Sequence, residues 1–491
     1  MLQKNIFNPK EFKPCRNEKD FMTMLKENPD IQFVRFWFAD LLGNVQCEFS
    51  VPVYEMNEDM FKHGKGYDGS SVLGQARINE SDKIAFPDPK TARILPWKYK
   101  GKTKGVDVEW REAVVFADIK NPDGTDYEGD CRAVLKKTLE KAKLKIGADK
   151  IYVGPELEYF LFESNGFGRP KIVDEKPVLL DSGSYFKTGR FGEIRKETQL
   201  LMQMMGYEFE YDHHEVAHSQ HETDVRYLDA LEMADFIMLY KYVVRRTARE
   251  AGLFASFMPK PIAKINGSGM HVHQSMFNKD INLFFDSKDE HKLSKMGKQY
   301  MAGLLTHIPE ITSVLNSWVN SYKRLVPGYE APVYICWDPQ NRSNLIRKPQ
   351  YAPNLEKATR LELRSPDPAA NPYLAFAVMI NAGIKGIMNS YDFPSPTKAN
   401  VYEMNSFQRA AKGIRSLPKN LEEALKLTEQ SDIVKETLGE HLFKSFIEDR
   451  RKHLGEYKAS LKKVSLIKRL KNNGYKTAIS PYEINELLPI L

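Results

Sequence analysis

The chain has 491 residues, of which 42% are hydrophobic, 11% aromatic and 28% charged. Its length exceeds what one hydrophobic core usually supports, so we expect two or more domains of an ordinary globular protein. The formal net charge of +7 equals the seven Lys and Arg of residues 458–476, which contain no acidic residue. The basic excess is therefore local, and it gives no general argument for binding nucleic acid.

Targeting and redox signals are few. The first twenty residues lack the apolar core of a secretory leader, and the longest apolar run, "PYLAFAVMINAGI", is far shorter than the roughly 20 residues that cross a bilayer. The cysteines at 15, 47, 131 and 336 form no CxxC pair and indicate no disulfide framework. We expect a cytoplasmic protein with reduced cysteines and no membrane partner.

The N-terminal part of the chain predicts strands. "IQFVRFWFAD" and "VQCEFSVPVYEM" flank "LLGN", which indicates a strand, a turn and a second strand. The turn-rich "NPDGTDYEGD" at 121–130 precedes the helical pattern "CRAVLKKTLEKAKLKIG". We place a domain boundary near residue 115, giving domains 1–115 and 116–491. Beyond it strands and helices mix, and residues 230–252 predict a long helix that ends at Gly252.

The strand expected over "IYVGPELEYFLF", residues 151–162, contains two glutamates among apolar residues. Glu156 and Glu158 point to the same face because alternate residues of a strand share a face. Two neighbouring carboxylates in apolar surroundings would be protonated or forced apart. A bound cation would remove that conflict.

Three further segments place polar groups on one strand face. They are "ATRLELRSPDP", with Arg360, Glu362 and Arg364; "NGSGMHVHQS", with His271 and His273; and "DHHEVAHSQHE", with Glu215 and Glu222. Each segment alone is explained by an exposed edge strand or by a core histidine with a backbone partner. Four such segments in one chain predict a shared polar cavity.

Inward-facing glutamates and a histidine require divalent cations, and oxygen-rich ligation favours Mg²⁺ or Mn²⁺ over zinc. The basic residues Arg342, Arg347, Lys357, Arg360 and Arg364 suit an anionic ligand, as in phosphoryl transfer. The usual nucleotide motifs are absent from the sequence. "GKT" at 101–103 resembles the end of a P-loop, but the glycine that a P-loop requires five residues before Gly101 is Pro96. No GxGxxG motif follows a predicted strand. An ATP site here belongs to another architecture.

An ordered set of motifs resembles type I glutamine synthetase. It comprises "GYDGSS", "ARINESD", "VGPELEYFLF", "HHEVAHSQHE", "NGSGMHVHQS", "NSYKRLVPGYEAPV", "NRSNLIRKP" and "RLELRSPDPAANPYLAFA". The seven-residue step from Glu215 to Glu222 and the serine of "RSPDP" resemble the family's alpha subgroup. The resemblance implies an α+β fold with a small β-grasp-like N-terminal domain and a larger catalytic domain, built on a curved antiparallel sheet with flanking helices.

The resemblance also implies roles for individual residues. One metal would be held by Glu158, Glu215 and Glu222 and a second by Glu156, His271 and Glu362, with two to three Mg²⁺ or Mn²⁺ per site. The ATP phosphates would meet Arg342, Arg347, Lys357 and Arg360, while Glu210, His273, Ser275 and Tyr227 would face the nucleoside and its base. Substrate glutamate would contact Glu158, Gly267, Arg324, Glu330 and Arg364.

The implied reaction joins ammonia to the side-chain carboxylate of L-glutamate, with ATP as co-substrate and γ-glutamyl phosphate as intermediate. Asp68 and Ser71 of an adjacent subunit would bind ammonium, Asp68 would take its proton, and Glu330 would close over the intermediate. The resemblance implies two stacked hexameric rings and allows nitrogen-regulatory partner proteins. Arg77 would link the N-terminal domain to feedback inhibition by glutamine, and Tyr402, taken as a surface tyrosine, raises the competing idea of adenylylation.

Two other functions stay open from the sequence. One is a γ-glutamyl ligase that uses a larger amine, such as a polyamine or ethanolamine; the other is a structural family member without activity. Four segments depart from the family pattern: His218-Ser219, "FKTGRFGEIR" after Tyr185, residues 98–112, and the basic 458–476. The basic segment predicts an amphipathic helix with a solvated face, and an acidic partner is its alternative.

Overall fold

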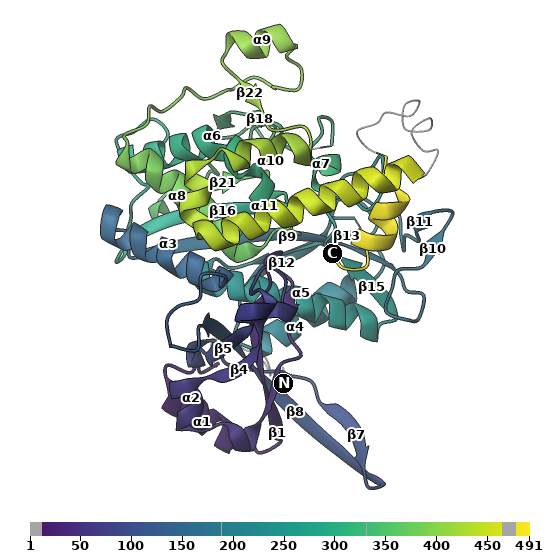
Figure 1. Cartoon of the computed structure of the whole chain (residues 1–491). Coiled ribbons are helices and arrows are strands. Elements are labelled where there is room, and N and C mark those ends of the chain that lie inside the picture. The colour runs from purple at the N-terminus through teal and green to yellow at the C-terminus, as the bar shows by residue number, and fades with distance from the viewer. Residues whose placement is uncertain (1–11, 188, 330, 464–477) are drawn as a thin grey trace, which may run out of the picture.

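The computed structural model describes residues 12–187, 189–329, 331–463 and 478–491. Two β-sheets divide this part of the chain. The N-terminal sheet lies at the bottom of Figure 1, and the second sheet lies above it among most of the helices. Glu330 and residues 464–477, which include most of the predicted basic helix of residues 458–476, lie outside the described residues. No helix of the described part is long and apolar enough to cross a bilayer.

The N-terminal sheet is organised around β1 and β8, which pair in parallel. Its strands are β1 (Ile31–Ala39), β2 (Val45–Gln46), β3 (Ser50–Pro52), β4 (Lys65–Asp68), β5 (Asp82–Pro87), β6 (Arg93–Ile94), β7 (Tyr99–Thr103) and β8 (Val106–Lys120), with helices α1 (Glu18–Glu27) and α2 (Glu58–His63). The predicted first strand and turn are confirmed, and Gly43 has the positive φ of 81° that such a turn requires. The predicted second strand is interrupted: β2 and β3 each pair separately with β1.

Strand β8 is long enough to extend beyond the body of the sheet. Its first residues pair with β7, and the two strands form the projecting ribbon at the lower right of Figure 1. This ribbon contains most of residues 98–112. Residue 115 lies inside β8, and the pairing of β8 with β5 continues as far as Lys120. The boundary near residue 115 stays a prediction.

The second sheet is centred on β9, which pairs antiparallel with β13 and β16. Its strands are β9 (Lys150–Glu163), β12 (Phe209–His214), β13 (Gln220–Val225), β14 (Leu228–Asp229), β15 (Leu253–Ser256), β16 (Met270–Asn278), β17 (Ile281–Asn282), β19 (Trp337–Asp338), β20 (Ile346–Arg347) and β21 (Leu361–Leu363). Two small pairs lie apart from it: β10 (Ile172–Val173) with β11 (Lys176–Pro177), and β18 (Tyr334–Ile335) with β22 (Arg415–Ser416).

Helices pack around this sheet. They are α3 (Cys131–Ile146), α4 (Gly192–Met204), α5 (Ala230–Glu250), α6 (Lys295–Leu315), α7 (Ser321–Arg324), α8 (Pro372–Met388), α9 (Ser406–Ala411), α10 (Leu421–Glu429) and α11 (Asp432–Lys463). The helices predicted after residue 130 and over residues 230–252 are confirmed as α3 and α5. Asp130 caps α3 by accepting a hydrogen bond from the Arg132 amide, and a left-handed Gly147 ends it. Lys458, in the last turns of α11, pairs with Glu422 at 2.7 Å.

Helices α6 and α8 pack against each other at glycines. A Cβ atom at Gly303 of α6 would lie closer than 3.0 Å to the Ala382 carbonyl oxygen. A Cβ atom at Gly386 of α8 would likewise lie closer than 3.0 Å to the carbonyl oxygen of Gln299. The two helix backbones are therefore in direct contact at this crossing.

Arg132 connects the N-terminal sheet to the helices of the second domain. Its buried guanidinium, on α3, donates to Asp235 of α5 at 3.1 and 3.0 Å. It also donates to Asp88 at 2.9 Å and to Asp118 of β8 at 2.5 Å. Burial opposes the charge of Arg132, but the carboxylates of Asp235 and Asp118 raise its pKa well above the usual value. The two parts of the chain are thus joined by a buried network of ion pairs.

Replacing Arg132 with methionine is expected to lower the free energy of unfolding by about 3–5 kcal/mol, because three carboxylates lose their buried partner. Urea unfolding followed by circular dichroism measures this change. Arg111→Met is the matched control, since Arg111 pairs with the partly exposed Asp30 at 2.6 Å. That pair should contribute less than about 1 kcal/mol. An equal decrease in the free energy of unfolding for the two variants would contradict the proposed contribution of the Arg132 ion pairs to stability.

Candidate active site

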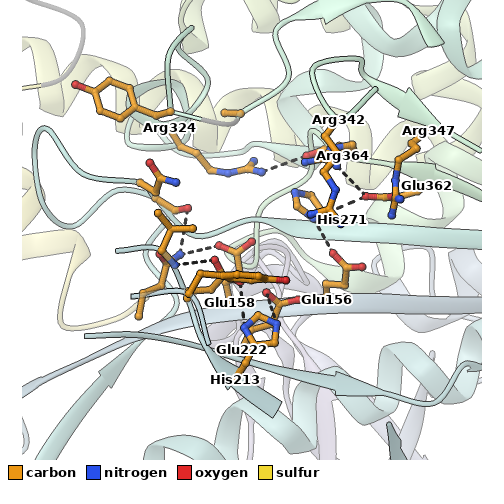
Figure 2. Close-up of a pocket in the computed structure, with 18 of the residues that line it drawn as sticks. Glu156, Glu158, His213, Glu222, His271, Arg324, Arg342, Arg347, Glu362 and Arg364 are labelled. Carbon is orange, nitrogen blue, oxygen red and sulfur yellow. Dashed lines mark hydrogen bonds and ion pairs between the residues drawn. The ribbon is translucent and has the colours of Figure 1, made fainter. Parts of the chain in front are cut away.

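A cavity of about 390 Å³ lies over β9, β13, β16 and β21 (Figure 2). The sequence-predicted residues that line it are Glu156, Glu158, Glu215, Glu222, Gly267, His271, His273, Arg324, Arg342, Arg347, Arg360, Glu362 and Arg364. The prediction that the four polar segments share one cavity is confirmed.

Strand register explains why these groups meet. Glu158 pairs across the sheet with Glu222 of β13, and Glu156 pairs with His271 of β16. Glu362 of β21 lies opposite His273. Because side chains alternate along each strand, the leucines on both sides of Glu362 turn to the other face and are fully buried. The alternation read from the sequence thus produces a polar face on an apolar sheet.

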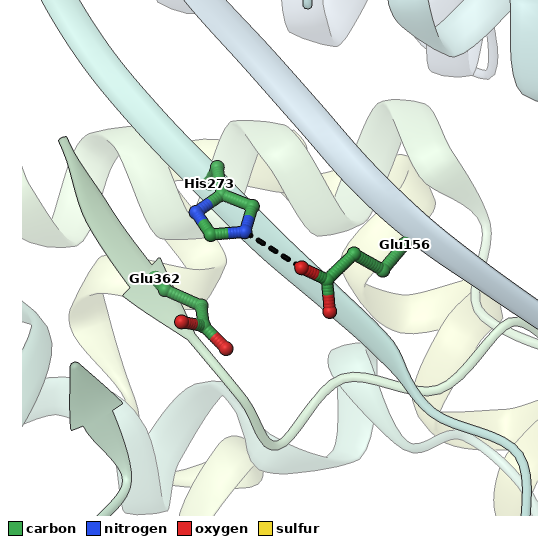
Figure 3. A group of neighbouring side chains, drawn as sticks. All are labelled: Glu156, His273 and Glu362. Atoms are coloured by element: carbon green, nitrogen blue, oxygen red, sulfur yellow. Dashed lines mark hydrogen bonds and ion pairs between the residues drawn. The ribbon is translucent and has the colours of Figure 1, made fainter. Parts of the chain in front are cut away.

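Glu156 is held by two histidines. Its carboxylate lies 2.7 Å from Nδ1 of His271 and 2.8 Å from Nε2 of His273 (Figures 2 and 3). Nδ1 of His273 accepts a hydrogen bond from Nε of Arg360 at 3.2 Å, so Nε2 carries the proton that faces Glu156. Burial works against ionisation, but the hydrogen bonds from both histidines hold the pKa of Glu156 well below its usual range.

Glu362 is almost fully buried between two arginines. Nε of Arg347 and Nη1 of Arg364 donate to its two carboxylate oxygens, the second at 3.4 Å. Burial opposes the charge, yet His273 and Arg364 lower the pKa of Glu362. Ligand atoms of Glu156, His273 and Glu362 lie within 4.8 Å of one another (Figure 3). The two carboxylates of this group can bind a divalent cation, and Nε2 of His273 would have to lose its proton to become the third ligand.

A second group consists of His213, Glu215 and Glu222, whose ligand atoms also lie within 4.8 Å of one another. Nδ1 of His213 is 3.4 Å from Glu215, and its Nε2 is 3.7 Å from Glu222. Burial, followed by repulsion from Glu215, raises the pKa of Glu158 well above its usual value. Burial and repulsion from Glu158 do the same for Glu222. This end of the cavity therefore has more carboxylates than cations.

The donor atoms fit Mg²⁺ or Mn²⁺, because both groups are rich in carboxylate oxygen. The two groups overlap the predicted ligand sets, which stay predictions. Glu156 and Glu362 belong to the first group, together with His273, and Glu215 and Glu222 belong to the second, together with His213. His271 still lies 4.0 Å from Glu362, and Glu158 still lines the cavity.

Two titratable groups beside the predicted carboxylates were not predicted. His213 lines the cavity and lies opposite Glu222 in the β12–β13 pairing. Asp224 is two residues beyond Glu222 on the same strand face and lines a smaller neighbouring cavity. Burial, and then repulsion from Glu156, raises the pKa of Asp224 to about 8. The alternation that identified Glu156 and Glu158 would also have identified Asp224.

Adding Mg²⁺ or Mn²⁺ is expected to raise the melting temperature and to release protons, because Glu158 and Glu222 must ionise to bind a cation. Since the pKa of each carboxyl is raised, cation affinity should increase with pH. Stability should rise by about 2.7 kcal/mol at a hundredfold excess over Kd. Calorimetric titration in buffers of different ionisation enthalpy counts the protons. Cation binding without proton release would show that the pKa values of Glu158 and Glu222 are not raised.

A neighbouring cavity of about 240 Å³ opens beside the first one. It contains every residue predicted for the nucleoside side of ATP, namely Glu210, Tyr227, His273 and Ser275, together with Lys357 and Arg360. Glu156, Tyr211, His273 and Arg360 line both cavities. A ligand in the smaller cavity can therefore reach the carboxylates and arginines of the larger one.

Arg324 lines the part of the central cavity that is not shared with the smaller one. Its buried Nη1 donates to the carbonyl oxygens of Ser365 at 2.7 Å and Pro366 at 3.0 Å. A side chain at Gly269 would collide with this guanidinium, so glycine lets the β16 backbone approach it. Burial lowers the pKa of Arg324, and the charge of Glu158 opposes that effect.

Other predicted site residues lie elsewhere. Asp68 is exposed at the end of β4 and accepts hydrogen bonds from the hydroxyls of Ser70 at 2.6 Å and Ser71 at 2.9 Å. It lines a separate hollow of the N-terminal domain, and Arg77 is exposed nearby in sequence. The interpretation of Tyr402 as a surface tyrosine is wrong. It lines the central cavity, its hydroxyl donates to the Ala331 carbonyl at 2.8 Å, and burial raises its pKa to about 12.

Comparison with known proteins gives matches for both domains. The models described as "Glutamine synthetase, beta-Grasp domain" and "Glutamine synthetase, catalytic domain" match residues 30–122 and 128–468. Glutamine synthetase of Methanosarcina mazei is 44% identical over 452 residues, or 91% of this chain and 96% of that relative. The enzyme of Thermotoga maritima is 41% identical over 438 residues, or 88% and 94%.

Solved structures give the same picture. A chain titled as a GmaS/ADP complex superimposes with a TM-score of 0.77 at 29% identity, covering 92% of this chain and 99% of its own. Plasmodium falciparum glutamine synthetase matches in fold with a TM-score of 0.77 at 24% identity, over 91% of this chain and 97% of its own. With two domain models and relatives above 40% identity along most of its length, the chain belongs to the glutamine synthetase family.

Proposed function

We propose that this chain uses ATP to ligate ammonia to the side-chain carboxylate of L-glutamate, through γ-glutamyl phosphate, and releases glutamine, ADP and phosphate. The family consists of ligases that use ATP and a divalent metal. The observation that carries the proposal is the pair of joined cavities. One is lined by carboxylates and histidines suited to cations, the other by the residues predicted to contact the nucleoside, and Arg360 lines both.

The arginines would prepare the phosphoryl transfer. Bound Mg²⁺ or Mn²⁺ would supply further neutralisation of phosphate charge. Arg360 lines both cavities and Arg347 lines the central one, so their guanidinium groups could pair with phosphate oxygens, and Arg342 would stabilise the transferred group. The glutamate carboxylate could then attack without strong repulsion, with Arg324 and Arg364 holding the rest of that substrate.

The amine step would use a second subunit. Asp68 is exposed and lines a hollow on the N-terminal domain, so it would serve the cavity of a neighbour. Hydrogen bonds from Ser70 and then Ser71 lower the pKa of Asp68, which keeps it ionised for binding ammonium. Asp68 would then accept a proton, leaving nucleophilic ammonia. Glu330, outside the described residues, keeps its expected role in closing the site, and two stacked hexameric rings remain the proposed assembly.

A ligase for a larger amine is the second candidate, because the likeness to the GmaS/ADP chain and membership of the family leave the amine acceptor undetermined. The test measures ADP release and the amide product, by mass spectrometry, with ATP, Mg²⁺ and glutamate. Ammonium, ethanolamine and spermidine are compared as acceptors. Glutamine formation with the highest kcat/KM for ammonium supports the proposal. A higher value for either amine would replace it, and no ADP release with any acceptor would indicate a structural family member.

Replacing Arg77 with alanine is expected to relieve inhibition by glutamine while leaving the substrate KM values within about twofold. Arg77 lies nine residues after Asp68, so a ligand-dependent shift of this exposed segment could move the ammonium site of a neighbour. Such coupling amounts to about 1–3 kcal/mol, or 5- to 150-fold in the inhibition constant. Inhibition curves for glutamine measure it. An unchanged inhibition constant would remove Arg77 from the proposal.

A further inference from the structure

Lys260 is a buried lysine that the proposed reaction does not use. It follows β15, its side chain has no exposed surface, and it does not line the central cavity. Its backbone is held on both sides: its amide donates to Oδ1 of Asn320 at 2.7 Å, and Nδ2 of Asn320 donates to its carbonyl at 2.9 Å. Asn320 is fixed in turn by Glu483 at 2.8 Å. Burying an ammonium group costs free energy unless contacts with other groups replace its lost hydration.

The ammonium of Lys260 contacts two separate segments of the cavity wall. Nζ donates a hydrogen bond to the carbonyl of Ile265, in the turn that leads to Gly267. The same Nζ lies 4.3 Å from the ring centroid of Tyr329, in the segment after α7. Gly267 and Tyr329 both line the cavity. One buried cation thus holds the substrate turn and the Tyr329 segment together from behind.

The packing at Gly267 makes this contact tight. A Cβ atom there would lie 3.1 Å from Cδ of Lys260 and closer than 3.0 Å to the Pro259 carbonyl oxygen. The next residue, Ser268, donates its amide to the same Pro259 carbonyl at 2.8 Å. Movement of the lysine stem would therefore move the turn that carries Gly267.

We propose that Lys260 is a positioning residue that fixes the distance between the Ile265–Gly267 turn and Tyr329, and so sets the affinity for the amino-acid substrate. The inference rests on the proposed function, because it assigns glutamate to this end of the cavity. A cation–π contact is stronger when it is buried than when it is exposed to water, and the contact between Lys260 and Tyr329 is formed by a buried ammonium that has no ion-pair partner among the described residues. Among the described residues, no carboxylate forms an ion pair with Lys260.

The charge of Lys260 is sensitive to pH. Burial, and then repulsion from Arg324, lowers its pKa to about 8. The charged or titratable groups around it are Arg324 of α7, Tyr329, and Glu483 beyond Asn320. Because a lowered lysine pKa means that the ammonium form is lost as pH rises through about 8, the hold on Tyr329 should weaken above that pH.

The test compares steady-state kinetics of the full chain, three single variants and one double variant with saturating ammonium. Lys260→Met should raise the KM for glutamate about tenfold while the KM for ATP changes by less than about twofold. Lys241→Met is the matched control: Lys241 is also buried, with a pKa lowered to about 7, but packs against Phe257 away from the cavity. It should leave both KM values unchanged.

Tyr329→Leu, which leaves the buried lysine in place, covers the case in which Lys260→Met does not fold. It should raise the KM for glutamate alone and add nothing further in the Lys260→Met background. In the unaltered chain that KM should rise above pH 8, and in Lys260→Met this pH dependence should disappear. An unchanged KM for glutamate in both single variants would overturn the inference. Failure of the unaltered chain to form glutamine is a different result, and it would overturn the proposed function instead.

Discussion

Replacing Glu362 with glutamine is expected to reduce glutamine formation about 10³-fold, because several kcal/mol of charge stabilisation would be lost. Glu362 is buried between Arg347 and Arg364 and shares a possible cation site with Glu156 and His273. The amide keeps the shape of the side chain but offers no negative charge to a cation. It also leaves the two arginines without their carboxylate, so a lower melting temperature is expected.

Glu290→Gln is the matched control for this variant. The Glu290 side chain is 81% exposed and outside both cavities, so its loss of charge should leave kcat and melting temperature unchanged. Size-exclusion chromatography shows whether the assembly persists. A Glu362→Gln variant that keeps more than roughly a tenth of the activity at saturating Mg²⁺, a loss below 1.4 kcal/mol, would show that Glu362 does not hold a catalytic cation.

Asp68→Ala should impair amide formation far more than the phosphorylation of glutamate. Asp68 is proposed to act only on ammonium, after the acyl phosphate has formed, so the variant should retain ADP release that is uncoupled from glutamine production. Its exposed position outside the chain's own cavity makes a second experiment possible. The experiment mixes the Asp68→Ala and Glu362→Gln chains after dissociation and measures activity on reassembly.

Mixed assemblies should recover activity that neither variant has alone. An intact cavity of an Asp68→Ala chain would then lie beside the intact Asp68 of a Glu362→Gln chain. The two variants incubated without dissociation are the control, since they share no assembly. Hybrids that form, as native mass spectrometry would show, and yet stay inactive would exclude the shared site.

Strand alternation carried most of the sequence prediction. Glu156 and Glu158 can be assigned to one face of their strand because side chains two residues apart in a strand point the same way. Pairing between strands then brings them together with Glu362. Helices α3 and α5 were predictable because Asp130, Gly147 and Gly252 mark their ends. These features depend on local geometry, which the sequence encodes directly.

Long-range packing was beyond that reading. Nothing local to His213 distinguishes a core histidine from a cation ligand until its opposite strand residue, Glu222, is known. The position of Tyr402 cannot be predicted from its neighbours in sequence, because its hydroxyl contacts the Ala331 carbonyl, 71 residues earlier in the chain. The interruption between β2 and β3 arises because each pairs separately with β1. The residue pattern of "VQCEFSVPVYEM" does not predict this interruption.

The contact between α6 and α8 has a consequence for how far this protein can vary. Where two backbones touch, every substituent is too large, so a saturation-mutagenesis library should retain only glycine at Gly303 and Gly386. At Gly455, near the end of the long α11, nothing lies within 4 Å of an added Cβ, and alanine there should be accepted and even favoured. Tolerance to substitution in these helices will thus follow the distance between backbones rather than the distance from the cavity, and attempts to raise thermal stability should begin at the open glycine.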